Sequence, residues 1–125
     1  MKKTKKGFTL VELIVAIAIF SILATVAIVG YTSFLNDAKN TKAEMELRPI
    51  VTYINAELAD DGKWEYGTDS PLTKDNISTE TLQAALNTVD AFKTLSTKVS
   101  VSKNEGVITI TYTTSENITA TATLN

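Results

Sequence analysis

Apolar residues are arranged with different periods in successive parts of the chain. An almost uninterrupted apolar run extends from Phe8 to Tyr31, and residues 32–61 that follow are rich in helix formers. Within the second part, apolar residues recur at the spacings of three and four that mark one face of a helix: Leu47, Ile50, Val51, Ile54 and Leu58. We therefore expect one long bent helix over residues 8–60, with an exposed first half and a half-buried second half.

One residue interrupts this pattern and a short polar motif ends it. Pro49 lies inside the pattern, and we expect a kink or local break there because proline lacks an N–H donor and collides with the preceding turn. Asp60-Asp61-Gly62 is typical of a helix end, and the polar residues 62–76 predict a loop. The side chains expected to anchor this loop to the core are Trp64, Tyr66 and Leu72. The alternative role of the two aromatic residues is ligand binding.

A second, shorter helical pattern runs from Ser78 to Leu95. Its apolar residues again lie three and four apart: Leu82, Ala85, Leu86, Val89 and Phe92. Ser78 is a suitable N-cap, and Glu80 suits the positive end of the helix dipole in the first turn. The pattern therefore predicts a helix over Ser78–Leu95.

The C-terminal part changes to a period of two, which predicts β-strands. The alternating segments are Val99–Val101, Val107–Thr113 and Ile118–Leu124, with turn residues between them. We expect a three-stranded antiparallel meander whose threonines face solvent and whose apolar face meets the long helix. The residues of that face are Ile108, Ile110, Tyr112, Ile118, Ala120, Ala122 and Leu124. The predicted fold class is α+β, with the long helix packed on this small sheet and a second short helix beside it.

The first apolar run is long enough to cross a membrane. The 24 residues from Phe8 to Tyr31 span about 36 Å as a helix, whereas the hydrocarbon core of a bilayer is about 30 Å thick. Four lysines precede the run in MKKTKKG, and an acidic segment follows it. This difference in charge predicts a cytoplasmic N-terminus.

One carboxylate, Glu12, lies inside the apolar run. A charged residue within a membrane helix costs about 2.5–3.5 kcal/mol on insertion scales, so a carboxylate in this place indicates a function. A secretory signal peptide and a plain membrane anchor are the two ordinary alternatives. The first has an apolar core of only roughly 7–15 residues, and the second leaves Glu12 unexplained.

The stretch Lys6-Gly7-Phe8-Thr9-Leu10-Val11-Glu12 resembles the processing site of type IV prepilins and the related pseudopilins. The resemblance covers the leader, the cleavage site and the apolar helix that follows. It implies that a membrane-embedded aspartyl peptidase cleaves after Gly7 and that the new amine of Phe8 is methylated. It also implies that Glu12 guides assembly of the subunit into a helical filament.

The resemblance implies a domain organisation, partners and a location. Residues 1–7 would be the leader peptide, 8–31 the transmembrane and filament-core helix, and 32–125 the extracytoplasmic globular pilin domain. The partners would be other copies in a homopolymeric filament, the prepilin peptidase and methylase, the pilus assembly platform in the membrane, and minor pilins. The subunit would cross the cytoplasmic membrane once before assembly and would be extracellular afterwards.

In such a filament, Glu12 of one copy can pair with the Phe8 amine of a neighbour, which relieves the desolvation cost of both charges. The apolar side chains of the helix would face lipid before assembly and one another afterwards. The residues expected to serve this membrane and filament packing are Leu10, Leu13, Ile14, Ile17, Phe20, Leu23, Val26 and Ile28.

The chain departs from the resemblance at two points. Many pilins carry proline where this chain has Val29, and the adjacent Gly30 is then the residue expected to give local flexibility. Many pilins also close a C-terminal loop with a disulfide, which this chain cannot form because it has no cysteine. Core packing must therefore hold the outer domain together.

Charge and composition narrow the function. The leader holds four of the twelve basic residues, so its removal leaves eight basic against fourteen acidic residues. Phosphate binding needs clustered Lys and Arg, and we therefore expect no nucleic-acid partner. The chain has neither His nor Cys, which removes Ser-His-Asp and Cys-His catalysis and the usual zinc ligands. Its carboxylates are scattered, so we expect neither enzyme activity nor a cofactor.

Two short patterns suggest binding or modification. Asp60-Asp61, Asp69 and Asp75 offer oxygen ligands of the kind that Ca²⁺ prefers, but their spacing is not that of an EF-hand, and we expect no metal site. Asn76-Ile77-Ser78 and Asn117-Ile118-Thr119 match the N-glycosylation sequon, a pattern that arises often by chance.

The sequence thus predicts a structural subunit of an extracellular type IV pilus. One alternative is a pseudopilin of a type II secretion or competence machine, which would build a short piston. The other is a membrane-tethered binding module that does not polymerise. Twitching motility, cell adhesion, biofilm formation, DNA uptake and secretion are not distinguished by the sequence.

Overall fold

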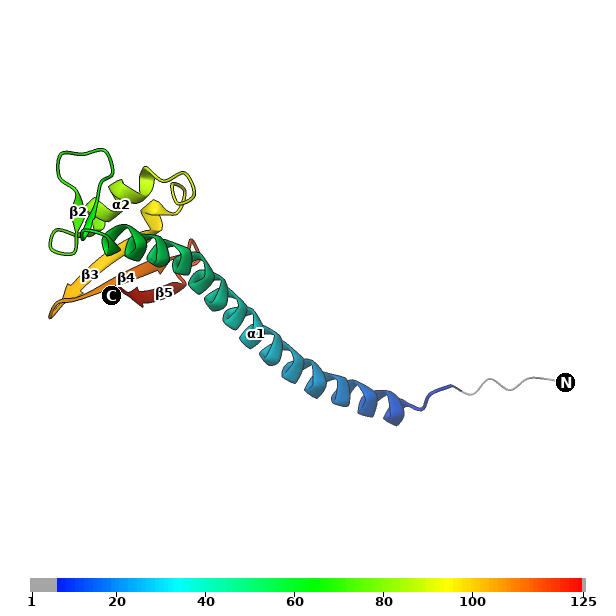
Figure 1. Ribbon diagram of the computed structural model, residues 1–125. Coiled ribbons are helices and arrows are strands. Elements are labelled where there is room, and N and C mark those ends of the chain that lie inside the picture. Colours follow the sequence, from blue (N-terminus) through cyan, green and yellow to red (C-terminus); the bar gives the residue numbers. More distant parts are fainter. Residues whose placement is uncertain (1–6, 125) are drawn as a thin grey trace. The chain divides into compact units, whose positions relative to one another are not determined.

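The computed structural model describes residues 7–124 and follows the predicted order of elements (Figure 1). The helices are α1 (Leu10–Ala59), α2 (Thr79–Asn87) and the short 3₁₀ helix η1 (Ser96–Lys98). The strands are β1 (Lys63–Trp64), β2 (Leu72–Thr73), β3 (Val99–Asn104), β4 (Val107–Thr113) and β5 (Thr119–Thr123). The fold is α+β, as predicted. Of the expected leader, only Gly7 falls within the described residues.

The chain divides into two compact units, Met1–Asp37 and Ala38–Asn125, and α1 contributes to both. In the described part of the first unit, α1 is exposed on all sides, and only Ala16 and Leu35 are half-buried. The helix continues through Val29 and Gly30 without interruption. A helix that is apolar all round needs a membrane or other chains to cover it.

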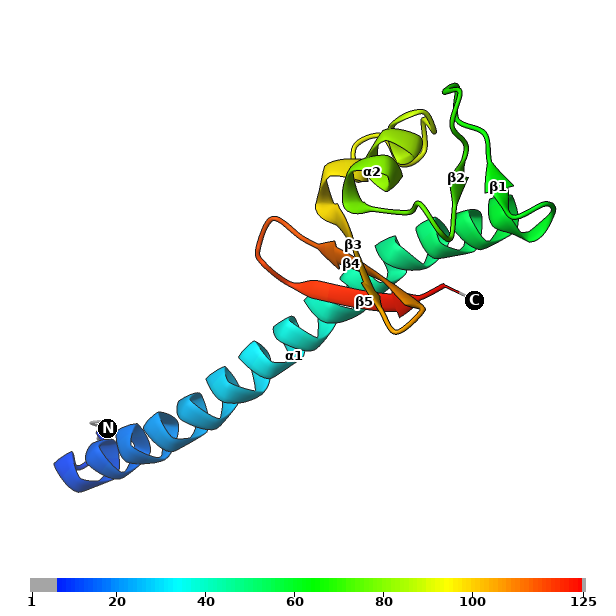
Figure 2. The same cartoon turned by 90° about the vertical axis from the view of Figure 1, so that its left-hand side faces the viewer.

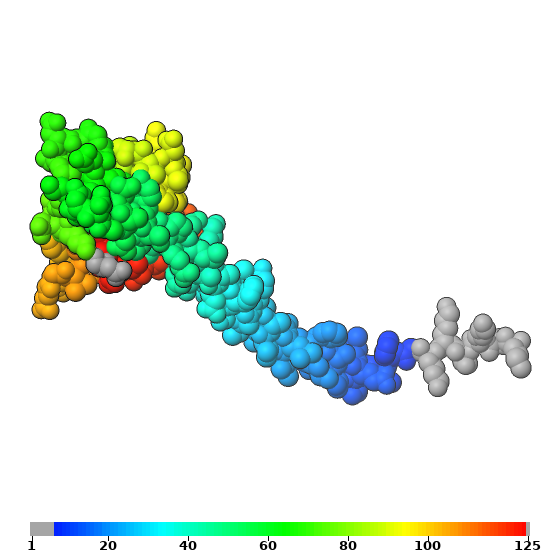
Figure 3. Space-filling model, viewed as in Figure 1, coloured from blue at the N-terminus to red at the C-terminus, as the bar shows by residue number. Residues whose placement is uncertain are grey.

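The core of the second unit is built by α1, α2, the three-stranded sheet and the β1–β2 pair, which form one closely packed body in the space-filling view (Figure 3). The predicted face of α1 is confirmed, since Leu47, Ile50, Ile54 and Leu58 are buried and Val51 is packed against them. Burying an aliphatic side chain of this size stabilises the fold by about 1.5–3 kcal/mol. These side chains therefore supply much of the cohesion of a unit that has no disulfide.

The sheet is the predicted antiparallel meander, with β4 between β3 and β5. Ile108, Ile110 and Tyr112 are buried on one face of β4. The threonines of β5 are exposed as expected, whereas those of β4 are half-buried. The difference arises because β4 is the central strand and has a neighbour on each side.

The first hairpin turn is shorter than predicted. β3 runs to Asn104, and only Glu105 and Gly106 connect it to β4, with φ angles of 50° and 84°. Positive φ at both central residues is characteristic of a type I′ turn, whose twist matches that of the strands. Residues 103 and 104, which we expected in the turn, are therefore paired with β4.

α2 starts as predicted. The Ser78 side chain accepts a hydrogen bond from the Thr81 backbone N–H (3.3 Å), and Thr81 Oγ1 accepts one from the Ser78 N–H (2.8 Å). This reciprocal capping box satisfies two N–H groups that the first turn leaves unpaired. The apolar residues of the helix face the core: Leu82, Ala85 and Leu86.

The expectation that this helix reaches Leu95 is wrong, because α2 ends at Asn87. Thr88 Oγ1 donates to the Ala85 carbonyl at 2.6 Å and so competes for a backbone acceptor. Turns with three-residue hydrogen-bond spacing then follow, as in the bond from Phe92 N–H to the Val89 carbonyl (2.9 Å). Thr, Val and Asp at 88–90 are all poor helix formers, so apolar spacing alone was misleading here.

The segment predicted as a loop contains a two-residue strand pair, in which Trp64 lies opposite Leu72. Two residues are too few for a period to be visible in the sequence. Both side chains are buried, which confirms their role as anchors. Tyr53 of α1 meets Trp64 and Phe92 in edge-to-face contacts, with ring centroids 5.4 and 5.5 Å apart. This geometry is favourable for aromatic pairs and fixes two irregular segments to α1.

The local break considered at Pro49 does not occur, since α1 continues through it to Ala59. The missing N–H deprives only the carbonyl of Met45 of its helical partner. Met45 and Pro49 both lie on the exposed face, where water can bind that carbonyl. The helix therefore passes the proline without losing a buried hydrogen bond.

A carboxylate on α1 has a partner in the sheet. The Tyr112 hydroxyl donates a hydrogen bond to Glu46 Oε2 at 2.5 Å. Burial, together with the neighbouring carboxylate, raises the pKa of Tyr112 to about 12. The bond gives the buried hydroxyl an acceptor and fixes the half-buried Glu46 side chain.

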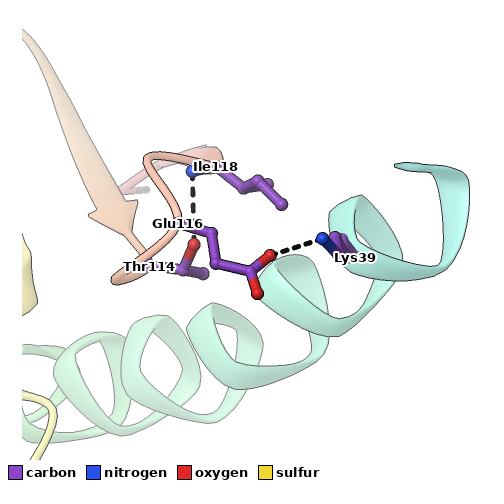
Figure 4. A network of polar contacts seen from close by, with 4 residues as sticks. All are labelled: Lys39, Thr114, Glu116 and Ile118. Atoms are coloured by element: carbon purple, nitrogen blue, oxygen red, sulfur yellow. Dashed lines mark hydrogen bonds and ion pairs between the residues drawn. The ribbon is translucent and has the colours of Figure 1, made fainter. Parts of the chain in front are cut away.

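The turn between β4 and β5 meets α1 through an ion pair (Figure 4). Lys39 Nζ lies 2.7 Å from Glu116 Oε2, and this contact lowers the pKa of the Glu116 carboxyl. Within the turn, the Ile118 N–H donates to Thr114 Oγ1 at 3.2 Å. Both charged side chains are about half exposed, so water screens the pair and its contribution to stability is small.

Candidate assembly site at the start of the long helix

The candidate site is the short segment that leads into α1. Gly7 and Phe8 precede the helix, which begins at Leu10, and the Phe8 side chain is 89% exposed. A Cβ added at Gly7 would meet nothing within 4 Å. Packing within this chain therefore does not require glycine at this position, and the Gly7–Phe8 peptide bond lies outside the helix.

Glu12 takes part in a capping box with Thr9. The Thr9 N–H donates to Glu12 Oε2 at 3.0 Å, and the Glu12 N–H donates to Thr9 Oγ1 at 3.3 Å. The two bonds satisfy N–H groups that the first helical turn leaves without partners. A carboxylate in this turn also interacts favourably with the positive end of the helix dipole.

The capping box uses only one of the two carboxylate oxygens of Glu12. Among residues 7–124, Glu12 Oε1 has no hydrogen bond and no ion pair. The side chain is exposed on a helix whose other surface is almost entirely apolar. Glu12 can therefore cap its own helix and bind an external cation at the same time.

The hydroxyl groups further along the apolar run need no external partner. Ser21 Oγ donates to the Ile17 carbonyl at 2.8 Å, and Thr25 Oγ1 donates to the Ser21 carbonyl at 2.9 Å. Such bonds let a hydroxyl enter an apolar medium because the helix itself supplies the acceptor. Glu12 is thus set apart from these side chains by its charge and by its unused oxygen.

The side chains expected to pack in a membrane or filament are all exposed, by between 52% and 74%. They are Leu10, Leu13, Ile14, Ile17, Phe20, Leu23 and Val26. They surround the helix, which meets the length and composition of a membrane span. An apolar surface of this extent on a soluble monomer would mark an interaction site.

Our interpretation of the sequence singled out Gly7, Phe8 and Glu12, whose assembly roles stay predictions, and it missed the capping role of Thr9. The signal was present, because Thr-x-x-Glu before an apolar run is the pattern of a capping box. It was overlooked because Glu12 was considered only as a charge in need of a distant partner. The structure gives the same residue a local role as well.

The other candidate sites do not assemble. No three acidic residues within the described range lie close enough together to hold a metal ion. Trp64 is buried as an anchor. The two sequons differ: the Asn76 amide is bonded to Thr73 N (2.7 Å) and to the Pro71 carbonyl (2.9 Å), whereas Asn117 is exposed in a turn.

The second unit has a mostly apolar groove of about 570 Å³. It is lined by Met45, Arg48, Pro49, Thr52, Tyr53, Ala56 and Phe92. Arg48 is its one charged side chain, so the groove has no pair of groups for acid–base chemistry.

Comparison with known proteins points to the same segment. A family model described as the prokaryotic N-terminal methylation motif matches residues 2–28. The chain is 35% identical over 73 residues to the type IV major alpha-pilin of Moraxella bovis, which covers 58% of this chain and 46% of that protein. The chain is thus similar to type IV pilins.

Two further relatives agree with this assignment. Fimbrial protein Q of Moraxella bovis is 32% identical over 77 residues, covering 62% of this chain and 49% of its own length. The type IV major fimbrial protein FimA of Dichelobacter nodosus is 36% identical over 63 residues, covering 50% and 39%. The pilin-like chain thus spans about half or less of the length of these curated relatives. No solved structure matches it.

Proposed function

We propose that this pilin-like chain is a structural subunit of an extracellular type IV pilus. It is inserted in the cytoplasmic membrane as a prepilin, cleaved between Gly7 and Phe8, and methylated on the new amine of Phe8. Assembly then transfers its apolar helix from lipid into the interior of a filament. The main observation behind this proposal is that Glu12, in the apolar first part of α1, has one carboxylate oxygen without a partner among residues 7–124.

The proposed partner of that oxygen is the Phe8 amine of a neighbouring subunit. An ammonium and a carboxylate that enter an apolar interior together relieve the desolvation cost that each would suffer alone. Methylation keeps the positive charge on the amine. The amine exists only after cleavage, so an unprocessed chain offers no cation at this position.

The named relatives favour a pilus over the alternatives. They are a major alpha-pilin and fimbrial proteins, whereas no observation specifically favours a secretion piston or a tethered binding module. The role we propose is structural and not catalytic, because the described residues of the site include no second carboxylate and no histidine or lysine that could activate the Thr9 hydroxyl as a nucleophile. The proposed processing partners are a prepilin peptidase and methylase, with an assembly platform in the membrane and minor pilins as partners in assembly.

The decisive test separates the two roles of Glu12. Glu12→Gln keeps a side-chain oxygen that can complete the capping box but removes the charge. Thr9→Ala keeps the charge but removes the cap, which costs about 0.5–2 kcal/mol of helix stability. We expect Glu12→Gln to be cleaved and membrane-bound but absent from filaments, and Thr9→Ala to assemble.

Filament yield is measured by electron microscopy of sheared surface fibres probed with antibody to this chain. Mass spectrometry of the membrane fraction reports cleavage and methylation of each variant, and Thr9→Ser serves as the conservative control. Normal filament yield from Glu12→Gln would contradict the ion-pair role. Absence of this chain from any fibre, with the parent sequence fully processed, would favour the tethered module.

A further inference from the structure

The two edges of the three-stranded sheet are treated differently by the fold. α2 lies along the free edge of β3, where Thr79 Oγ1 accepts from the Val101 N–H (3.0 Å) and Gln83 Nε2 donates to the Val99 carbonyl (2.9 Å). Figure 2 shows β5 at the other edge of the sheet, away from α2. No corresponding element of the described chain pairs with β5 on its outer side.

The hydrogen-bond register shows which groups of β5 remain free. Leu124 N–H bonds the Ile108 carbonyl (2.9 Å), and Thr114 N–H bonds the Ile118 carbonyl (2.8 Å). Hydrogen-bonded and non-bonded pairs alternate along an antiparallel ladder, so the even-numbered residues of β5 bond to β4. The backbone groups that point to the open edge therefore belong to Thr119, Thr121 and Thr123, which have no hydrogen-bond partner in residues 7–124.

This edge lacks the features that usually protect an edge strand. Charged side chains, proline, bulges and covering elements normally prevent pairing with other chains. β5 is Thr-Ala-Thr-Ala-Thr, without charge or proline, and its pairing with β4 is regular at all five residues. Its three threonines are exposed, and threonine is well suited to strands.

We infer that the open edge of β5 pairs antiparallel with β5 of a second copy of this chain. The strand reads the same in both directions, so a two-fold axis at Thr121 places threonine opposite threonine and alanine opposite alanine. Thr121 then lies opposite Thr121 of the partner, and Thr119 lies opposite Thr123 of the partner. Each of these pairs exchanges two hydrogen bonds, and Thr–Thr pairs across strands are favourable.

The charges beside the edge fit the same symmetry. Glu44 and Arg48, one turn apart on α1, line a groove together with Thr121 and Ala122. Both are exposed, and neither forms an ion pair within residues 7–124. A two-fold rotation about Thr121 reverses their order, which brings Glu44 of one copy toward Arg48 of the other.

This inference rests on the proposed function in one respect, which is that the two copies are taken to meet as subunits of filaments. Subunits of a helical filament contact one another head to tail, whereas a two-fold contact uses the same patch on both copies. The β5 pair would therefore join subunits of adjacent filaments. Five residues per strand bury less than a stable dimer needs, but the repetition of the contact along two filaments multiplies its strength.

The test uses single cysteines in a chain that has none. A hydrogen-bonded antiparallel pair has Cα atoms about 5.5 Å apart, within the disulfide range of about 4.4–6.8 Å. Under mild oxidation of filament suspensions, we expect Thr121→Cys alone to give a disulfide dimer. Thr119→Cys and Thr123→Cys should each stay monomeric alone but form a dimer when the two variant filaments are mixed.

Ser102→Cys is the matched control, because Ser102 is exposed on β3, whose edge α2 covers. Adding Thr121→Lys to the mixed Thr119→Cys and Thr123→Cys filaments should reduce their dimer to the Ser102→Cys level and disperse filament bundles in electron micrographs. Filaments of Thr121→Cys that cross-link no more than Ser102→Cys would overturn the pairing while the proposed function stands.

The same variants in detergent-extracted membranes separate the two proposals. If no filament forms but the disulfide still traps a Thr121→Cys dimer from the weak isolated contact, the β5 pairing stands and the pilus assignment fails. If Thr119→Cys or Thr123→Cys cross-links alone as strongly as Thr121→Cys, the two-fold register at Thr121 is wrong.

Discussion

The two parts of α1, here called its first and second lengths, differ in whether the chain itself buries their apolar side chains. From Leu10 to Asp37, α1 is exposed on every side, and most of its side chains are apolar. From Ala38 to Ala59, only one stripe is apolar, and that stripe is buried in the core of the same chain. The helix is one continuous element, so the difference lies in the arrangement of side chains and not in the backbone.

The carboxylates of the two lengths show the same contrast. Glu46 receives a hydrogen bond from Tyr112 of its own chain, whereas within residues 7–124 Glu12 bonds only its own first helical turn, and its Oε1 has no partner there. The second length has its apolar stripe buried and its Glu46 carboxylate hydrogen-bonded within the chain. On the proposed function, lipid covers the apolar side chains of the first length before assembly, and other copies of the chain cover them afterwards. A complete description of the fold of one chain therefore leaves the first length unexplained.

The largest expected effect tests this contrast directly. Ile54→Ala removes a fully buried side chain and should lower the free energy of unfolding of the second unit by about 2–5 kcal/mol. Ile17→Ala removes the same atoms from an exposed position and should change it by less than about 0.5 kcal/mol. Thermal unfolding of the full chain in detergent, followed by circular dichroism, measures both. Equal losses would abolish the distinction between the two lengths.

A smaller effect is expected from Tyr112→Phe, which removes the internal partner of Glu46. Hydrogen bonds to charged groups contribute about 1.5–3 kcal/mol, and we expect a loss in this range at neutral pH. The measurement is urea unfolding of both proteins, with Tyr31→Phe as an exposed control. A neutral result would mean that solvent can replace Tyr112 as the partner of Glu46.

The same tyrosine predicts a dependence on alkaline pH. Its pKa is about 12 in the folded chain against 10.0 as the reference value, so the unfolded state releases its proton first. The stability from this group is fully present below pH 10 and is lost as the pH rises toward 12. Unfolding curves across this range should fall more steeply for the parent than for Tyr112→Phe, and parallel curves would exclude this linkage.

The two capping boxes sharpen the comparison further. Ser78→Ala removes the cap of α2 and should cost about 1 kcal/mol in the unfolding of the second unit, since α2 is part of its core. Thr9→Ala removes the corresponding cap of α1 but should leave that unfolding transition unchanged. Differential scanning calorimetry of the two variants checks the difference, and Ser78→Asp should restore stability. A shift of the same transition by Thr9→Ala would contradict the independence of the two lengths.

The smallest effect is expected at the exposed Lys39–Glu116 pair. Glu116 has a lowered pKa because of Lys39, so any stability from the pair is present above the unfolded pKa and is lost as pH falls through the lower, folded value. Glu116→Gln should remove only this acid-sensitive and salt-sensitive component. Unfolding at low and high salt, at neutral and acidic pH, measures it, and a loss unaffected by salt would indicate packing instead.

The helices and strands that could be predicted from the sequence are those in which apolar residues recur at a regular spacing over the whole element. The apolar stripe of α1 and the alternation in Val107–Thr113 were each visible over a whole element and were confirmed. The end of α2 was not visible, because Val89 and Phe92 continue the spacing while Thr88 already competes for a backbone carbonyl. The β1–β2 pair was too short to have a period.

The candidate site was predictable in its residue types but not in its local geometry. Gly7, Phe8 and Glu12 were recognised through a resemblance, and the apolar helix supported it physically. The sequence did not show that the hydroxyl groups of Ser21 and Thr25 bond to carbonyls of the helix itself, nor that Glu12 uses only one oxygen in the capping box. Such assignments depend on distances, which residue spacing alone does not fix.

On the proposed function, the position of the first capping box has a consequence for cleavage of the chain. Because Thr9 and Glu12 start the helix at Leu10, the Gly7–Phe8 bond lies outside the helix, where, on the proposed function, an active-site cleft could bind it directly. A helix that began one turn earlier would first have to be unwound, at about 0.5–1.5 kcal/mol for each backbone hydrogen bond. Loss of the cap would therefore change the rate of maturation, and not the final amount of fibre.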